Sequence, residues 1–255
     1  MFKRIRILIL LFILATVALG AYRAESRNRS WENTLQVAVY PINADGSAAS
    51  TNFIARLGRD DLSLVEDYFQ RQSERHGLSL QRPIRLTLAQ PVASLPPVRP
   101  ATASALAAIQ WTLALRYWAW RHSPDIGFEP DIRLYVLYHD PAQNERVPDS
   151  TGLAKGQLAV VHQFARSREQ GSNLVVLSHE LLHTLGATDL YDPANSLPLY
   201  PEGYAEPEKT PRYPQNHAEL MAGRIPVTET QADIPLSLRE TLVGRRTAHE
   251  IGWLK

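Results

Sequence analysis

Cysteine is absent from this 255-residue chain. Its absence excludes disulfide frameworks, zinc sites built from thiolates, cysteine nucleophiles and any zymogen switch that depends on cysteine. An excess of charge of one sign is also missing, because 27 Lys and Arg balance 26 Asp and Glu and leave a formal net charge of +1. This balance gives no overall electrostatic basis for nucleic acid or an anionic membrane as a partner. The length and a hydrophobic content of 44% indicate one globular domain, with or without a second lobe.

The apolar segment at residues 7–22 follows three basic residues at the N-terminus. A basic segment before a short apolar one is typical of an export signal, and Ala18 and Gly20 are small residues that fit cleavage after Gly20. The alternative is an uncleaved membrane anchor, although the segment is slightly shorter than the ~20 residues that a spanning helix needs. A third alternative is a buried core helix. The first two place the rest of the chain outside the cytoplasm, in the periplasm or the extracellular space.

The rest of the sequence predicts strands and helices of ordinary length after a polar tether at residues 23–33. Strands are expected where β-branched and aromatic residues alternate between turn residues, and helices where apolar residues recur every three or four positions. We expect residues 156–165 to form an edge strand, because glycines before them indicate a turn. The strands are expected at 35–43, 83–92, 131–140 and 156–165, the helices at 59–77, 101–122 and 171–186, and a last helix within 232–255.

The segment at residues 101–122 is apolar nearly all round and carries Trp111, Trp118 and Trp120. A helix that is hydrophobic on all sides is typical of a buried position, so we expect a core helix here. The alternative is a helix at a membrane interface, where tryptophan is enriched.

The expected helix at residues 171–186 carries polar side chains among many leucines and valines. Ser172 or Asn173 is expected to cap its start, and Gly186 lies where a left-handed residue would end it. Burying histidine and glutamate in such a helix costs free energy unless they have partners. Some compensating interaction is therefore expected.

The motif H-E-x-x-H supplies that interaction. His179 and His183 lie one turn apart on one helix face, so both imidazoles can reach one ion at about 2.0–2.1 Å. Glu180 lies beside the ion, where it can take a proton from a metal-bound water. Gly186 lets the chain reverse, so that Asp189 returns a carboxylate as third ligand. Three protein ligands leave a fourth position for water, which distinguishes catalytic from structural zinc.

Other candidate ligands are Asp192 and His217, but on spacing alone both are better interpreted as solvated loop residues. His162 is expected to lie on the surface of a sheet. The remaining histidines, His76, His122, His139 and His249, have no ligand spacing.

The stretch "HELLHTLGATD" (179–189) resembles the extended signature of the metzincin metallopeptidases, with Asp189 in place of their last histidine. Aspartate at this position occurs in snapalysin-like enzymes, and the stretch also resembles immune-inhibitor-A-like peptidases. Met221, in "HAELMAGRIP", resembles the methionine turn beneath the metal. The resemblance implies an α+β fold for residues 34–255, with a mixed twisted sheet and active-site helix in 34–186, and the methionine turn and last helix in 187–255.

The resemblance implies a zinc-dependent endopeptidase with one zinc ion per chain, Glu180 as the base, and peptide or protein substrates. The strand at 156–165 is a candidate for pairing with an extended substrate. The long connection before Met221 has four tyrosines that are candidates for the oxyanion site or the substrate pocket, although packing or a place on the loop surface is the better interpretation for each one taken alone. These are Tyr191, Tyr200, Tyr204 and Tyr213.

Two alternatives remain open, a zinc amidase acting on cell-wall peptides and a catalytically silent peptide-binding module. Retention of Glu180 argues against the silent module, because binding alone needs no general base. Residues 21–34 leave no room for a folded pro-domain, so control is expected from substrate access, a partner or a membrane location.

Overall fold

The computed structural model describes residues 6, 19–20, 26–100 and 104–255. The expected export signal or anchor at residues 1–22 therefore lies almost wholly outside the described residues, as do the first three residues of the segment 101–122. Within the described part of the chain, no helix combines the length and the apolar character needed to cross a membrane.

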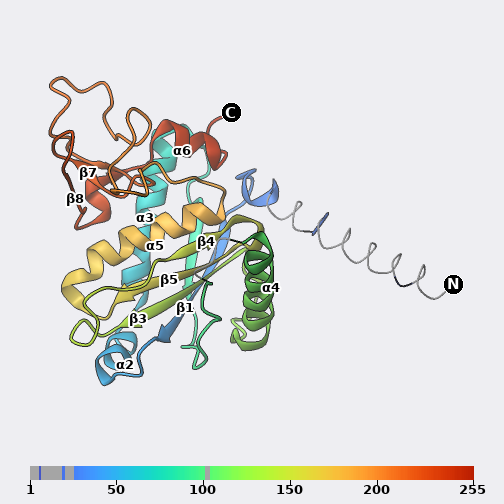
Figure 1. The fold of residues 1–255 in the computed structure, drawn as a ribbon. Coiled ribbons are helices and arrows are strands. Elements are labelled where there is room, and N and C mark those ends of the chain that lie inside the picture. The colour runs from blue at the N-terminus through green and yellow to red at the C-terminus, as the bar shows by residue number, and fades with distance from the viewer. Residues whose placement is uncertain (1–5, 7–18, 21–25, 101–103) are drawn as a thin grey trace.

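A five-stranded, mostly parallel sheet forms the centre of the fold (Figure 1). Its order is β2-β1-β3-β5-β4, and only β4 runs antiparallel to its neighbour. Strands were expected near all of these positions except β4, and β2 is shorter than expected. The bounds are β1 Leu35–Asn43, β2 Ile84–Leu88, β3 Ile132–His139, β4 Thr151–Leu153 and β5 Leu158–Phe164.

The expectation that residues 156–165 form an edge strand was wrong. β5 lies between β3 and β4: it pairs with β3 along its length and with β4 over residues 158–160, so it is an internal strand of the sheet. The edge is β4, which the sequence did not indicate, because three residues are too few to carry a strand pattern.

Helices cover both faces of the sheet (Figure 1). Along β1, Val37 and Val39 point into one core with helices α3 and α5, while Ala38 and Tyr40 point into a second core with helix α4. This alternation follows from the two-residue period of a strand. α3 and α4 were expected, and the short helix α2 was not. The helices are α2 Ala48–Ile54, α3 Arg59–Arg75, α4 Ala105–His122, α5 Gln170–Thr184 and α6 Arg245–Glu250.

The expectation that the segment 101–122 is a buried core helix was wrong. Only Leu115, Trp118 and Ala119 of α4 are buried, and most of its other apolar side chains are exposed. The sequence pattern did not reveal this because apolar residues lie on all sides of the helix, so the pattern does not single out the face that packs on the sheet.

The C-terminal segment lies beside α5 and contains only short elements (Figure 1). The expected long last helix within 232–255 was wrong: α6 has six residues, since Pro235 and Gly244 interrupt the segment. Residues 26–33 of the expected tether reach this region, where Trp31 is buried and its Nε1 donates to the Ile251 carbonyl at 2.8 Å. The short strands are β6 Ala218–Glu219, β7 Ile225–Pro226, β8 Ala232–Asp233 and β9 Thr241–Leu242, and single 3-10 turns lie at Ala154–Gly156, Ser167–Glu169 and Leu238–Glu240.

Candidate metal centre

Helix α5 carries the H-E-x-x-H motif and begins earlier than expected. Its first residue is Gln170 and Glu169 occupies the capping position, so the expected cap at Ser172 or Asn173 was wrong. Both side chains instead bind neighbouring segments: the Ser172 hydroxyl donates to Pro235 O at 3.1 Å, and Asn173 Nδ2 donates to Phe164 O at 2.9 Å. The start of the helix is thus fixed by tertiary contacts.

The end of α5 is the one that the sequence predicted. Gly186 has a φ of +96°, a left-handed conformation that strains other residues. Its N–H donates to His183 O, and the next N–H, from Ala187, donates back to Leu182 O at 3.1 Å. This pair of bonds is a Schellman motif, which ends the helix and reverses the chain. The reversal brings Asp189 back over the helix face that carries the histidines.

Three donor atoms from this helix and loop converge. His179 Nε2 lies 3.1 Å from Asp189 Oδ1, and His183 Nε2 lies 3.2 Å from the same oxygen. Ligands at about 2.0–2.1 Å from a tetrahedral zinc ion are separated from one another by roughly 3.3 Å. The observed separations are compatible with a ligand set, and they are also those of hydrogen bonds between the imidazoles and the carboxylate.

The other nitrogen of each imidazole binds a backbone carbonyl. His179 Nδ1 lies 3.0 Å from Leu220 O, and His183 Nδ1 lies 2.9 Å from Ala187 O. A carbonyl oxygen can only accept, so both Nδ1 atoms carry the proton and both Nε2 lone pairs face the carboxylate of Asp189. Lone pairs and a carboxylate repel each other unless a positive charge lies between them. The arrangement therefore requires a proton or a metal ion at this point.

The charges of the site agree with that requirement. Burial alone lowers the pKa of His183, but the nearby carboxylates of Asp189 and Glu180 outweigh burial and raise this pKa above its usual value. Burial would raise the pKa of Asp189, yet hydrogen bonds to both histidines hold that pKa well below its usual range. A cation is thus favoured beside an ionised Asp189.

Glu180 is buried beside these ligands, with only 6% of its surface exposed. Burial raises the pKa of its carboxyl group, and the neighbouring histidines and a backbone hydrogen bond from Gly152 counteract part of this effect. Its Oε2 has no hydrogen-bond partner among the described residues. A buried carboxylate oxygen without a partner is costly, so Glu180 Oε2 is a polar atom that a bound group could satisfy.

The edge strand β4 lies against the helix at this point. A Cβ atom on Gly152 would lie 2.5 Å from the Cβ of His183 and 2.7 Å from the carbonyl oxygen of Glu180. Only glycine permits so close an approach between strand and helix. Gly152 thus brings the edge of the sheet directly beside the ligands.

Met221 lies in a tight turn beneath the helix and is fully buried. Its carbonyl accepts from Leu190 N at 3.0 Å, next to Asp189, and the preceding Leu220 carbonyl binds His179. The turn therefore contacts both segments that carry the ligands.

Glu219 holds this turn in place. Its fully buried carboxylate accepts hydrogen bonds from the backbone of Met221, Ala222 and Gly244 and from the Thr247 hydroxyl, at 2.6–3.1 Å. Burial raises the pKa of Glu219, and these four bonds oppose the rise. Glu219 was not singled out in the sequence, where the lone acid within the apolar stretch "AELMA" was the only signal.

Replacing Glu219 with alanine is expected to lower the free energy of unfolding by about 3 kcal/mol or more, because several buried donors would lose their acceptor. Urea unfolding followed by circular dichroism measures this change. Glu229→Ala is the matched control, since Glu229 is exposed in the same region, and should change the stability by less than about 0.5 kcal/mol. Equal stabilities of the two variants would contradict this role of Glu219.

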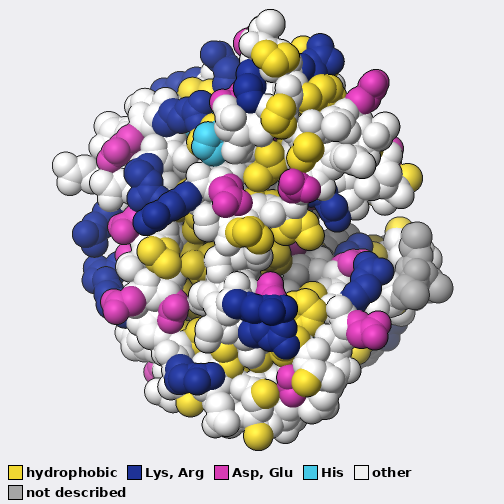
Figure 2. Space-filling model, turned by 90° about the vertical axis from the view of Figure 1, so that its left-hand side faces the viewer, with side chains coloured by type: hydrophobic (Ala, Val, Ile, Leu, Met, Phe, Trp, Pro, Cys, Tyr) yellow, Lys and Arg dark blue, Asp and Glu magenta, His cyan; other side chains and the backbone are white. Residues whose placement is uncertain are grey.

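The ligands face an open cleft of about 690 Å³. The C-terminal segment forms one side, and β4 with the residues before it forms the other. Figure 2 shows the surface hollowed between an upper and a lower part of the molecule, with charges of both signs scattered over this face. The residues that line the cleft include Ser150, Thr151, Gly152, Leu153, His162, Val176, His179, Glu180, His183, Asp189, Tyr191 and Ile234.

Of the four candidate tyrosines, Tyr191 lines the cleft. Burial and the charge of Asp189 raise the pKa of its hydroxyl, which therefore stays protonated. Tyr204 and Tyr213 instead bind each other, with their hydroxyl oxygens 2.8 Å apart, and Arg212 stacks on Tyr200. Those three pack within the long loop.

The other candidate ligands lie in different surroundings. The carboxylate of Asp192 accepts from Ala194 N in a local turn, and His217 Nδ1 lies 3.9 Å from Glu206. His162 lines the cleft, and its Nδ1 lies 2.9 Å from His139 Nε2. Burial and the neighbouring His139 lower the pKa of His162 to about 4, so it is neutral at neutral pH.

Comparison with models of known protein families gave no match, and comparison with curated protein sequences gave none either.

Proposed function

We propose that this chain is a zinc-dependent endopeptidase with a metzincin-like catalytic domain. The observation that carries the proposal is the convergence of His179 Nε2, His183 Nε2 and Asp189 Oδ1 beside the buried carboxylate of Glu180. An antiparallel edge strand, a mostly parallel sheet and a tight turn at Met221 beneath the helix are compatible with that group of folds.

The two imidazoles and one carboxylate would hold one zinc ion per chain, because nitrogen and oxygen donors in this number suit an open catalytic site. When bound, the ion would lower the pKa of a water molecule and polarise the scissile carbonyl group. The carbonyls of Leu220 and Ala187 fix the tautomers and orientations of the histidines, which is the usual role of groups that hydrogen-bond to metal ligands.

Glu180 would act as the general base and then as the general acid. Its unpartnered Oε2 takes a proton from the attacking water, and the same group passes this proton to the leaving amine. Burial raises the pKa of the carboxyl group toward neutral pH, where a group that both accepts and donates a proton works best. The Tyr191 hydroxyl, protonated and in the cleft, is the candidate among the four tyrosines for donating to the developing oxyanion.

An extended peptide is the substrate that this cleft suits. Thr151, Gly152 and Leu153 of β4 line it, and β4 is an edge strand with one side unpaired within the sheet. A peptide laid along that side would add a strand to the sheet, with its backbone held close to the ligands by the approach of Gly152. β4 therefore takes the role that the sequence had suggested for residues 156–165.

We place the enzyme outside the cytoplasm, in the periplasm or extracellular space, on the sequence pattern of residues 1–22. A silent binding module is less well supported, because the unpartnered oxygen of Glu180 costs stability without contributing to peptide binding. An amidase would use the same residues and differs in the bond that is cleaved.

Incubating the full chain with a mixed peptide library and, separately, with cell-wall peptide fragments tests the proposal. Mass spectrometry is expected to detect cleavage of ordinary peptide bonds, its loss after removal of zinc with a chelator, and its return with added zinc. Cleavage of the cell-wall fragments alone would favour the amidase. Hydrolysis that persists after chelation, or no hydrolysis of either substrate, would contradict a zinc peptidase.

A further inference from the structure

Helix α4 carries a stripe of exposed apolar side chains. We define the stripe as Leu106, Ile109, Leu113, Tyr117 and Trp120, which are 58–76% exposed. Their spacing of three or four residues places them on one helix face over about 21 Å. The stripe is therefore one continuous surface rather than scattered single residues.

The stripe is held in a fixed orientation. The opposite face of α4 packs on the sheet through Leu115 and Trp118, and the Trp118 ring lies 4.9 Å from that of Tyr135. Trp111 Nε1 donates to Pro97 O at 2.9 Å, which ties the first half of the helix to the preceding segment. Because α4 is anchored on one side, the stripe cannot be buried by rotating the helix.

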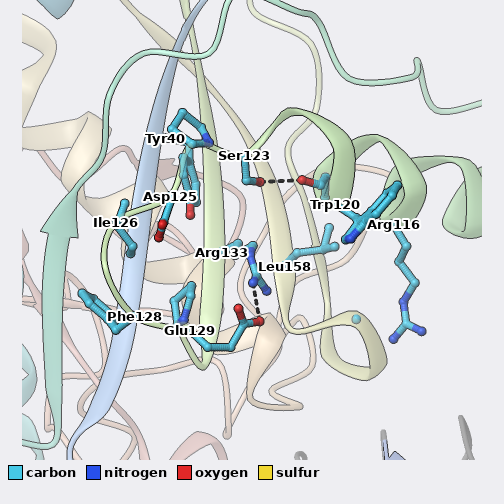
Figure 3. A pocket seen from close by; sticks show the side chains of 14 residues that line it. Tyr40, Arg116, Trp120, Ser123, Asp125, Ile126, Phe128, Glu129, Arg133 and Leu158 are labelled. Atoms are coloured by element: carbon cyan, nitrogen blue, oxygen red, sulfur yellow. Dashed lines mark hydrogen bonds and ion pairs between the residues drawn. The ribbon is translucent and has the colours of Figure 1, made fainter.

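A partner should cover such a surface. Burying one large apolar side chain contributes about 1.5–3 kcal/mol, and soluble monomers seldom expose contiguous apolar patches of this kind. The cavity at the end of α4 lies next to the stripe and has a mixed lining: Figure 3 shows Trp120 at one side of it and Ile126 and Phe128 at the other, and Asp125, Glu129 and Arg133 line it as well. Phe128 is itself 40% exposed.

The composition of α4 fits a lipid surface. The helix contains no acidic residue, and its basic residues are Arg116, Arg121 and His122. Tyr117 and Trp120 lie in the stripe with their ring centroids 5.9 Å apart. Leucine and aromatic side chains on one face with arginine nearby are typical of helices that lie in a membrane interface, where arginine meets anionic headgroups. The near-zero net charge of the whole chain does not alter this local balance.

The place where the chain enters the domain supports the same partner. Residues 26–33 lie above α4 in the view of Figure 1, and Trp31 packs into the core on the face of the sheet that α3 and α5 cover. In the sequence only residues 23–25 separate Ser26 from the apolar segment 7–22, and three residues span at most about 11 Å. If that segment enters a membrane, the end of the domain that carries residues 26–33 lies next to it.

We propose that α4 lies in the plane of a membrane interface, with the stripe in the boundary between headgroups and acyl chains. The sheet separates α4 from α5, so the helix with the candidate metal ligands lies on the opposite face, away from the lipid. If the segment 7–22 also enters the membrane, the domain is bound at two points and its orientation on the membrane is fixed. This proposal is independent of the chemistry in the cleft.

Site-directed labelling tests it, because the chain has no cysteine of its own. Leu113→Cys and, as a matched control, Leu64→Cys would be made in the full chain and labelled with an environment-sensitive fluorophore. Leu64 is an exposed leucine of α3, 53% exposed against 61% for Leu113, on the other face of the sheet. Both proteins would be placed with vesicles of phosphatidylethanolamine and phosphatidylglycerol, with and without nitroxide-labelled lipid.

The label at position 113 is expected to shift its emission to the blue when vesicles are added and to lose emission to the nitroxide lipid, at a depth of about 5–10 Å. The label at position 64 should do neither. Emission at 113 that stays water-like in the presence of vesicles overturns the proposal. It is also overturned if that label is already shielded without vesicles and the nitroxide lipid does not quench it, because a second copy or the segment 7–22 would then cover the stripe.

Discussion

Replacing Glu180 with glutamine is expected to lower the rate of peptide hydrolysis by about 10²–10⁴-fold while zinc stays bound. Glutamine keeps the shape of the side chain but cannot take a proton from the attacking water. The ligand atoms of Glu180, His179 and His183 lie within 4.8 Å of one another, but the proposed ligands are the two histidines and Asp189, so the zinc content should remain at that of the parent. Elemental analysis measures the metal, and hydrolysis of a peptide identified in the library measures kcat.

Glu169→Gln is the control for this substitution, because Glu169 lies at the start of the same helix and pairs with Arg168 outside the cleft. Its activity should equal that of the parent. A Glu180→Gln protein as active as this control would remove Glu180 from the mechanism. A variant without zinc would instead make Glu180 a ligand.

Asp189→Ala is expected to weaken zinc binding by more than about 100-fold. Losing a residue that only hydrogen-bonds to a metal ligand costs about 10–100-fold in affinity, and losing a ligand itself should cost more. The carboxylate also supplies the negative charge that both histidine Nε2 atoms face. Competition with a chromogenic chelator measures the affinity.

Asp192→Ala is the matched control, three residues further along the same loop. The Asp192 carboxylate accepts from Ala194 N and Asn195 Nδ2, so its removal should loosen a surface turn and leave zinc affinity unchanged. The opposite result, with Asp192→Ala losing zinc and Asp189→Ala retaining it, would make Asp192 the third ligand and contradict the proposed site.

The sequence predicted those parts of the fold that depend on local patterns. β1 was predicted with its observed bounds, since β-formers run between clear turn residues, and α3 and the end of α5 followed from helical spacing and from Gly77 and Gly186. The start of α5 differs from the prediction, because Ser172 and Asn173 bind the carbonyls of Pro235 and of Phe164 at the end of β5 rather than capping the helix.

In the candidate site, too, the residues with a local sequence pattern were predicted, and those that depend on distant contacts were not. The spacing of His179, His183 and Asp189 predicted a set of donors that converge, and the three do converge in the structure. Gly152 and the bonds of Glu219 to Gly244 and Thr247 could not be found, because they depend on contacts with segments about 25 or more positions away. A pattern within ten residues contains no information about such contacts.

The edge of the sheet and the surface of α4 show a second limit. Whether a strand is internal depends on its neighbours, and β5 was taken for an edge because the three-residue β4 left no pattern. For α4, the apolar residues predicted a helix buried on all sides, but only one face packs on the protein. Sequence hydrophobicity indicates that a surface needs covering and does not identify what covers it.

The most direct measurement of the central claim is X-ray absorption at the zinc edge of the full chain, combined with its metal content. The account predicts one zinc per chain, bound by two imidazole nitrogens at about 2.0–2.1 Å and one carboxylate oxygen at about 2.0–2.2 Å, with water in the fourth position. A chain that binds no zinc, or a zinc ion closed off by four protein ligands, would contradict it.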